Sequence, residues 1–175
     1  MRDLIPYMDT SMIKPGCNLN RAVNWVLASR NIENFKYVKD TLETHPWVMD
    51  ELVLNPNITV EFARYCMVKR IPINMGQYGL SANPAFLGYI ESYPDHELFF
   101  WGVGGVSSNV GLTEKFIIKF SDRLDFGSLG VSILPVVTPD LVLMFPEKNW
   151  SFDRNFGIGH FTDPRLDEEE EKKND

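Results

Sequence analysis

Apolar and polar positions recur along the chain at an interval of about 26 residues. Each interval opens with a landmark group, which is an aliphatic residue followed by small or polar residues and often by Asn-Pro. Landmark groups begin at Leu27, Leu52, Leu80, Val106 and Val131, and a decayed one begins at Ile158. The last four spacings of this series are 28, 26, 25 and 27 residues. Because regular periods of this length are typical of stacked repeats, the pattern predicts tandem copies of one structural unit.

The first half of each copy is predicted to be an amphipathic helix. Thr59, Thr113 and Thr138 stand before the apolar stretches, where their hydroxyls can accept a free backbone N–H group, and Asn34 does so in the earlier copy. Spacings of three and four residues place the apolar side chains on one stripe of each helix. The stripes contain Phe62, Tyr65, Cys66 and Val68; Phe116, Ile117 and Phe120; and Leu141, Val142 and Phe145.

The second half of each copy follows a helix breaker, usually a proline. A short apolar group comes next, such as Trp47 with Met49, Phe99 with Trp101, and Trp150 with Phe152. We interpret it as a short second helix that ends at a glycine acting as a C-cap. These glycines are Gly79, Gly105, Gly130 and Gly157. Alternation over three residues fits a short strand as well, so both alternatives stay open.

These halves together predict an all-α fold. A single unit is too small to bury its own apolar face, so neighbouring units must stack. We expect a compact α-solenoid of about five degenerate helix–turn–helix repeats in a single domain, residues 1–166. Residues 1–20 form the predicted N-terminal cap, and residues 167–175 form an acidic disordered tail.

The landmark groups resemble a known repeat. Asn-Pro-Asn-Ile-Thr at 55–59 and Leu-Ser-x-Asn-Pro at 80–84 are similar to the short Leu-Ser-x-Asn-Pro-x-Ile-Thr repeats in proteins of large double-stranded DNA viruses. The resemblance covers roughly residues 21–160 and is closest at 52–71. It implies a viral origin and helical stacking, and it carries over no catalytic residue.

Charge narrows the classes of partner. The net charge is −7, and residues 167–175 alone contribute −4 through six acids and two lysines. Clustered Lys and Arg, which direct nucleic-acid binding requires, are missing. No apolar run approaches the length that spans a membrane, and no signal peptide is apparent. The expected location is the host-cell cytoplasm or the virion, with Cys17 and Cys66 as free thiols.

Candidate chemistry is sparse. Asp95, His96 and Glu97 could supply metal ligands, but adjacent residues on a turn diverge, so a solvated loop is favoured. The glycines at 102–105 lack the spacing of a phosphate-binding or dinucleotide loop. We therefore predict no enzyme activity, no cofactor and no metal site.

Aromatic residues offer the best candidate contact. Most recur at equivalent repeat positions, which favours core packing. Phe99, Phe100 and Trp101 cannot all face inward, so at least one is expected on the surface. Together with Asp95 and His96 they form the predicted protein contact.

Function is predicted from this absence of a catalytic constellation and from the repeats. We expect a non-enzymatic scaffold or adaptor that binds viral or host proteins. The alternative is an inhibitor whose acidic tail blocks a basic, nucleic-acid-binding groove of a host enzyme. Its tail residues would be Asp167, Glu168, Glu169, Glu170 and Glu171.

Overall fold

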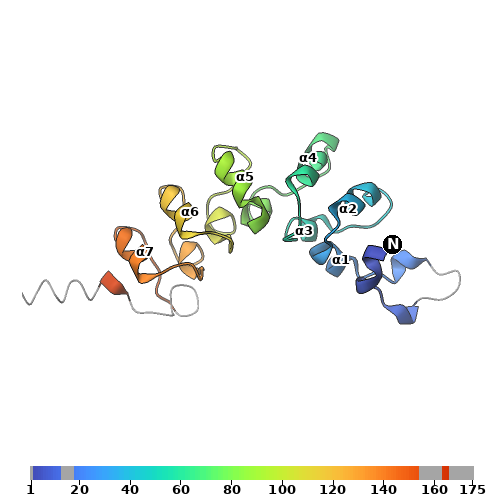
Figure 1. Ribbon diagram of the computed structural model, residues 1–175, viewed down its shortest axis with the longest axis horizontal. Helices are drawn as coiled ribbons and strands as arrows, with labels where there is room; N and C mark the ends of the chain where they lie inside the picture. The colour runs from blue at the N-terminus through green and yellow to red at the C-terminus, as the bar shows by residue number, and fades with distance from the viewer. Residues whose placement is uncertain (1, 13–17, 154–162, 166–175) are drawn as a thin grey trace, which may run out of the picture. The chain divides into compact units, whose positions relative to one another are not determined.

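The computed structural model describes residues 2–12, 18–153 and 163–165, and it is helical over this part of the chain (Figure 1). These ranges contain no β-strand, and their one β-type contact is an isolated bridge between Met8 and Val23. The predicted all-α class is therefore confirmed. None of the described helices is long and apolar enough to cross a membrane.

The chain divides into two compact units, residues 1–75 and residues 76–175, which we call unit 1 and unit 2. The predicted single domain at 1–166 stays a prediction. Unit 1 contains the 3-10 helices η1 (Arg2–Tyr7), η2 (Thr10–Met12) and η3 (Leu19–Arg21), followed by α1 (Trp25–Asn31), α2 (Phe35–Thr41), α3 (Met49–Leu52) and α4 (Val60–Lys69). Unit 2 contains η4 (Leu80–Ala82), η5 (Pro84–Phe86), α5 (Leu87–Ser92), η6 (Val106–Ser108), α6 (Glu114–Lys119), η7 (Val131–Ile133) and α7 (Pro139–Met144).

Unit 1 is built from pairs of packed helices. α1 packs against α3, and α2 packs against α4. The N-terminal segment lies against α1 through η1, where Asn24 N–H donates to the Tyr7 carbonyl at 2.8 Å and Asp9 N–H donates to the Ala22 carbonyl at 2.8 Å. Leu4 is buried in this contact region. The N-terminal residues thus pair with the start of the first full copy.

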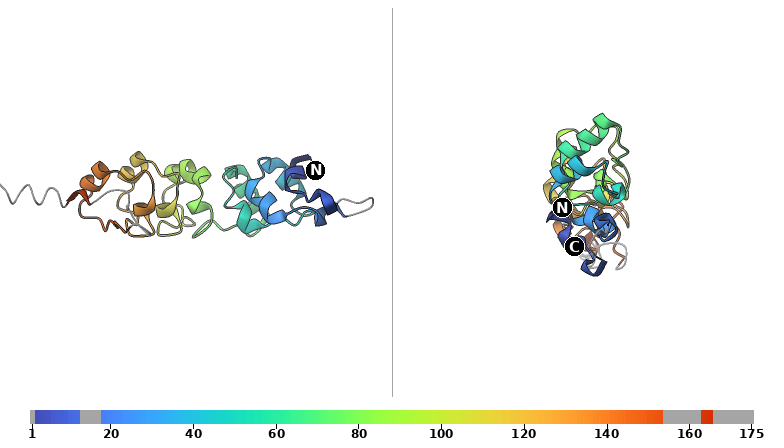
Figure 2. Two further views of the ribbon diagram at one scale, coloured as in Figure 1. Left: turned by 90° about the horizontal axis from the view of Figure 1, so that it is seen from below. Right: turned by 90° about the vertical axis from the view of Figure 1, so that its right-hand side faces the viewer.

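Unit 2 repeats one arrangement along its length. The helices α5, α6 and α7 follow one another in chain order, as both Figure 1 and the left view of Figure 2 show. The 3-10 helix η6 contacts both η4 and η7. Each 3-10 helix comes directly from a landmark group, and each α-helix comes from the amphipathic stretch after it.

Side-chain oxygens mark the starts of the helices. Thr59, Thr113 and Thr138 each accept the backbone N–H three residues on, at 3.1, 3.2 and 3.2 Å. Asn34 accepts the Tyr37 N–H in the same way at 3.1 Å. The four predicted N-caps are confirmed. In the copy that has no threonine at this place, α5 starts without a side-chain cap.

Removing one of these caps gives a local, testable loss. Thr113→Ala leaves the Phe116 N–H without its acceptor and is expected to lower the free energy of unfolding by about 1 kcal/mol. Thr113→Ser keeps the hydroxyl and should retain most of the stability. Urea unfolding followed by circular dichroism measures both variants, and equal midpoints for the alanine and serine variants would contradict the capping role.

The predicted helical stripes are mostly buried. The apolar residues predicted for 114–120 all lie in the core. In α4, Phe62 and Cys66 are buried, but Val68 is 81% exposed, so its predicted place on the stripe is wrong. Val68 lies two positions after Cys66, and residues two apart in a helix point to different sides.

The landmark glycines stand at the beginnings of helical turns. Gly79, Gly105 and Gly130 are the N-cap residues of η4, η6 and η7. Their predicted role as helix C-caps is therefore wrong. The segments before them, at 99–101 and 124–126, form neither a second helix nor a strand. The second helical element of each copy in unit 2 begins at the glycine instead of ending there.

Close backbone approach explains two of these glycines. A Cβ atom at Gly105 would lie 2.0 Å from the carbonyl oxygen of Phe100, and one at Gly130 would lie 2.1 Å from the carbonyl oxygen of Asp125. Glycine is required at both positions because an added side chain would overlap a backbone carbonyl oxygen.

The landmark serines make one contact four times. Ser29, Ser81, Ser107 and Ser132 are fully buried. Each Oγ accepts the backbone N–H of a residue 18 or 19 positions later, at 2.8 to 3.0 Å. The donors are Val48, Phe100, Asp125 and Ser151. Because a buried polar group needs a hydrogen-bond partner, each serine fixes the segment that follows the breaker against its own landmark group.

Landmark asparagines join one copy to the copy before it. Asn55 Nδ2 donates to the carbonyls of Ser29 and Ile32, at 2.9 Å in both cases. Asn109 Nδ2 donates to the carbonyl of Ser81 at 3.2 Å. Both asparagines are buried. These hydrogen bonds pair each buried amide with backbone carbonyls that lie 23 to 28 residues earlier in the sequence.

Candidate functional site

The predicted contact residues after α5 have different environments. Phe99 is buried, with its ring edge-on to Tyr89 at a centroid distance of 5.9 Å, and His96 packs on it at 5.3 Å. Phe100 is 40% exposed. The expectation that at least one of the three consecutive aromatics reaches the surface is confirmed. Their role in binding a protein stays a prediction.

Trp101 and Asp95 are joined by a residue that the sequence did not single out. The Arg123 guanidinium lies 4.2 Å from the centroid of the Trp101 ring, and its Nη1 donates to Asp95 Oδ1 at 2.8 Å. Trp101 also packs on Phe116 and Phe120. The ion pair is open to solvent and contributes little stability. Together with Phe99 and His96, four of the five predicted contact residues are thus engaged within the unit.

The next copy repeats this arrangement with a lysine. Lys148 Nζ lies 5.4 Å from the centroid of the Phe126 ring and 3.7 Å from Asp122 Oδ1. Lys148 follows Arg123 by 25 residues, which is the repeat interval. A basic residue after each of these helices therefore covers an aromatic ring and pairs with an acid of the preceding copy.

The glycine loop at 102–105 is covered by two aromatic rings. A Cβ atom at Gly104 would lie 2.7 Å from the Tyr78 ring, and one at Gly102 would lie 3.0 Å from the Phe100 ring. Tyr78 N–H donates to the Gly104 carbonyl at 2.6 Å. Both residues of this pair have a positive φ angle, 55° at Tyr78 and 79° at Gly104. The glycines therefore have a packing role beneath the rings.

Ser108 connects the glycine loop at 102–105 to the turn before the next landmark group. Ser108 Oγ accepts from Gly104 N–H at 2.9 Å and donates to the Leu129 carbonyl at 2.6 Å. Leu129 is 47% exposed and adjoins Gly130, where a Cβ atom would lie 3.4 Å from Asp125 Cβ. The Ser108 hydroxyl thus links the glycine loop at 102–105 to the turn that contains Leu129.

We call Tyr78, Phe100, Asp125 and Leu129 the turn-edge patch. Its three apolar members are exposed by 66, 40 and 47%, and Asp125 is exposed as well. Sequence reasoning found only Phe100, through the run of three aromatics. The other members stand alone in turns, and nothing in their local sequence distinguishes them from ordinary surface residues.

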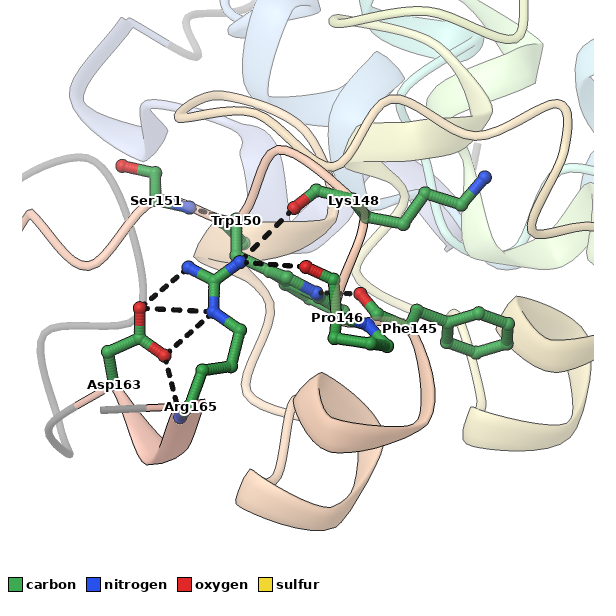
Figure 3. Close-up of polar contacts among 8 residues, drawn as sticks. Phe145, Pro146, Lys148, Trp150, Ser151, Asp163 and Arg165 are labelled. Atoms are coloured by element: carbon green, nitrogen blue, oxygen red, sulfur yellow. Dashed lines mark hydrogen bonds and ion pairs between the residues drawn. The ribbon is translucent and has the colours of Figure 1, made fainter. Parts of the chain in front are cut away.

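Arg165 holds the last described residues against the loop after α7 (Figure 3). Its guanidinium donates to both carboxylate oxygens of Asp163, at 2.6 to 3.1 Å. Nη1 also donates to the carbonyls of Pro146 at 3.1 Å and Lys148 at 3.5 Å. The guanidinium lies 5.4 Å from the Phe152 ring centroid. The Arg165 side chain thus connects residues 163–165 to the loop that follows α7.

The contact with Arg165 makes Asp163 sensitive to pH. Hydrogen bonds from the Arg165 side chain lower the pKa of Asp163 below its ordinary value of 3.8. A lowered folded-state pKa stabilises the contact above the unfolded value and loses this stabilisation as pH falls through the folded value. We expect the carboxyl carbon resonance of Asp163 to titrate below pH 3.8.

Arg165→Gln should move that midpoint upward, toward the ordinary value. Asp9 provides an internal control, because hydrogen bonds from Ser11 lower its pKa and Arg165 has no part in them. Its resonance should titrate identically in both proteins. An Asp163 midpoint that does not change in Arg165→Gln would remove the guanidinium as the cause.

Cys66 is a buried free thiol, and burial raises its pKa to about 11, so it stays protonated at neutral pH and is a poor nucleophile. Within residues 2–12, 18–153 and 163–165, no three His, Cys, Asp or Glu side chains are grouped to hold a metal ion. Cys17, Gly157, Ile158 and the predicted tail residues 167–171 lie outside the described residues.

Comparisons of the chain with protein-family models, with curated proteins and with solved structures found no match in any of the three. Function is therefore inferred from the side-chain contacts described above.

Proposed function

We propose that the chain is a non-enzymatic scaffold or adaptor, an α-solenoid of about five helix–turn–helix copies that binds a protein partner. The contact of the buried landmark serines carries this proposal. Four serines accept a backbone N–H at the same place in four copies, 18 or 19 residues later in each. Repetition of a buried contact supports one backbone geometry for all of these copies.

Stacking is supported by the asparagines. Asn55 and Asn109 donate to carbonyls of the landmark group one copy earlier. A buried amide and a buried carbonyl must both be hydrogen-bonded, and these pairs can form only when two copies lie against each other. Units of this size cannot bury their apolar faces alone, so the hydrogen bonds and the apolar contacts favour the same stacked arrangement.

The surface of such a stack supports binding. Stacked repeats place equivalent residues in rows, and rows of exposed positions form extended binding surfaces. In unit 2 the turn-edge patch consists of exposed side chains from successive copies, and hydrogen bonds through Ser108 link the glycine loop to the turn at Leu129. A fold by itself does not determine a function, so this patch, and not the solenoid, is the proposed site of contact.

The proposed setting follows from the repeat sequence. The likeness of residues 52–59 to repeats of large double-stranded DNA viruses supports a viral protein that works in the virion or in the host cytoplasm. Its partner would be a viral structural protein or a host factor.

Crosslinking mass spectrometry in cells that naturally contain the protein tests this function. We expect a stoichiometric complex with crosslinks from Lys115, Lys119 or Lys148, all of which lie in unit 2. The complex should survive removal of residues 167–175. A protein that remains monomeric and without crosslinked partners would overturn the scaffold, and a complex lost with the tail would favour the acidic inhibitor instead.

A further inference from the structure

A chain of hydrogen bonds joins the turns that carry Tyr78 and Leu129 of the turn-edge patch. Tyr78 N–H is bonded to Gly104, Gly104 N–H to Ser108, and the Ser108 hydroxyl to the Leu129 carbonyl. Glycine occupies three of the four positions of the loop at 102–105, where Val103 supplies the one side chain, and the rings of Tyr78 and Phe100 lie against Gly104 and Gly102. A peptide that binds here therefore meets chiefly the two rings and glycine backbone.

The backbone conformation of Tyr78 is strained and therefore destabilises the fold. Its left-handed φ of 55° strains any residue with a Cβ atom, and glycine or asparagine is the usual occupant. Despite this strain the ring is 66% exposed and therefore gains little from burial. Strained backbone combined with an exposed aromatic ring favours a role for the ring at the surface.

Charge indicates which partner fits. The Asp125 carboxylate is exposed, and its described contact is the Gly127 N–H, at 2.8 Å from Oδ1. Four of the basic side chains described in unit 2, Lys119, Arg123, Lys148 and Arg165, pair with acids outside the patch. The fifth, Lys115, lines a shallow depression with Ile118 on α6. The described residues of this unit include ten acids and five bases, which give them a net charge of −5.

We propose that the turn-edge patch binds a basic peptide segment of a partner protein. An Arg or Lys of that segment pairs with Asp125 and lies over the ring of Tyr78 or Phe100, as cations do on aromatic faces. Apolar residues beside it cover Leu129. The inference deepens the proposed scaffold function, because it names the chemistry of the partner at that site.

Three fluorescent peptides test the patch directly. They have equal length and equal leucine content, and their remaining positions are serine and a variable residue that is always Arg, always Gln or always Glu. Fluorescence anisotropy with the full chain should give binding of the Arg peptide at least about ten-fold tighter than binding of the Gln peptide, and weakest binding of the Glu peptide.

Two variants remove the patch without removing the fold. Tyr78→Gly deletes the ring and relieves the strained backbone, and Asp125→Asn deletes the charge but keeps an oxygen for the Gly127 N–H. Each should weaken binding of the Arg peptide about ten-fold. The control is Ile118→Ser, which removes an apolar side chain that is 40% exposed on α6, outside the patch. It should bind the Arg peptide like the unchanged chain.

The outcomes of these experiments distinguish a failure of the basic-peptide site from a failure of the proposed scaffold function. Equal affinity for the Arg and Glu peptides, or unchanged affinity in both Tyr78→Gly and Asp125→Asn, would overturn the basic-peptide site. A crosslinked complex that survives in Tyr78→Gly would then leave the scaffold in place with another contact. Conversely, Arg-peptide binding that needs Tyr78 and Asp125 would stand even if no stoichiometric cellular complex were found.

Discussion

Gly105→Ala is expected to prevent unit 2 from folding in its present form. The added methyl group would lie 2.0 Å from the Phe100 carbonyl oxygen, which already accepts the Val106 N–H at 2.9 Å. A backbone clash of this size cannot be relieved by a side-chain rotation. We expect a loss of about 4 kcal/mol or more in the free energy of unfolding. Thermal unfolding measured by circular dichroism, with an amide NMR spectrum, reports the loss.

Gly88→Ala is the matched control. Gly88 lies in α5, where a Cβ atom meets nothing within 4 Å. Alanine restricts the unfolded chain and favours the helix, so this variant should gain about 0.5–1 kcal/mol. The two substitutions are chemically identical and are expected to change stability in opposite directions. A Gly105→Ala protein that melts at the same temperature as the unchanged chain would refute the close backbone approach.

Ser107→Ala is expected to give the second largest loss. The buried hydroxyl accepts the Asp125 N–H at 2.8 Å and donates to the Trp101 carbonyl. Alanine leaves the buried Asp125 N–H without its acceptor, at a cost of about 1–3 kcal/mol, and leaves the Trp101 carbonyl with the backbone N–H of residue 107, at 3.2 Å. We expect a total loss of about 3 kcal/mol, which corresponds to a melting temperature lower by about 6–12 °C.

Ser128→Ala distinguishes this loss from a general effect of removing a hydroxyl. Ser128 is exposed in the turn before Leu129, so its removal should change the free energy of unfolding by less than about 0.5 kcal/mol. Similar midpoints for the two variants in urea would mean that the buried serine contact contributes nothing.

Local features were predictable from the sequence alone. A threonine N-cap accepts an N–H only three residues away, so Thr59, Thr113 and Thr138 could be assigned without knowledge of the fold. The helical stripe at 114–120 was equally readable, because three- and four-residue spacing determines which side chains share a face. The run at 99–101 also indicated correctly that one aromatic would be exposed.

Only the tertiary structure decided which residues meet across longer separations. The role of Gly105 depends on a carbonyl brought within 2.0 Å, and that of Ser107 on an N–H 18 residues away. Hydrogen bonds through Gly104 and Ser108 link the backbone of Tyr78 to that of Leu129, although 51 residues separate them. Propensity and periodicity act within one helical turn, whereas these contacts depend on how whole copies pack. The sequence therefore determined the amphipathic helices with side-chain N-caps, and packing determined the 3-10 helices that begin at the glycines, the buried polar contacts and the candidate site.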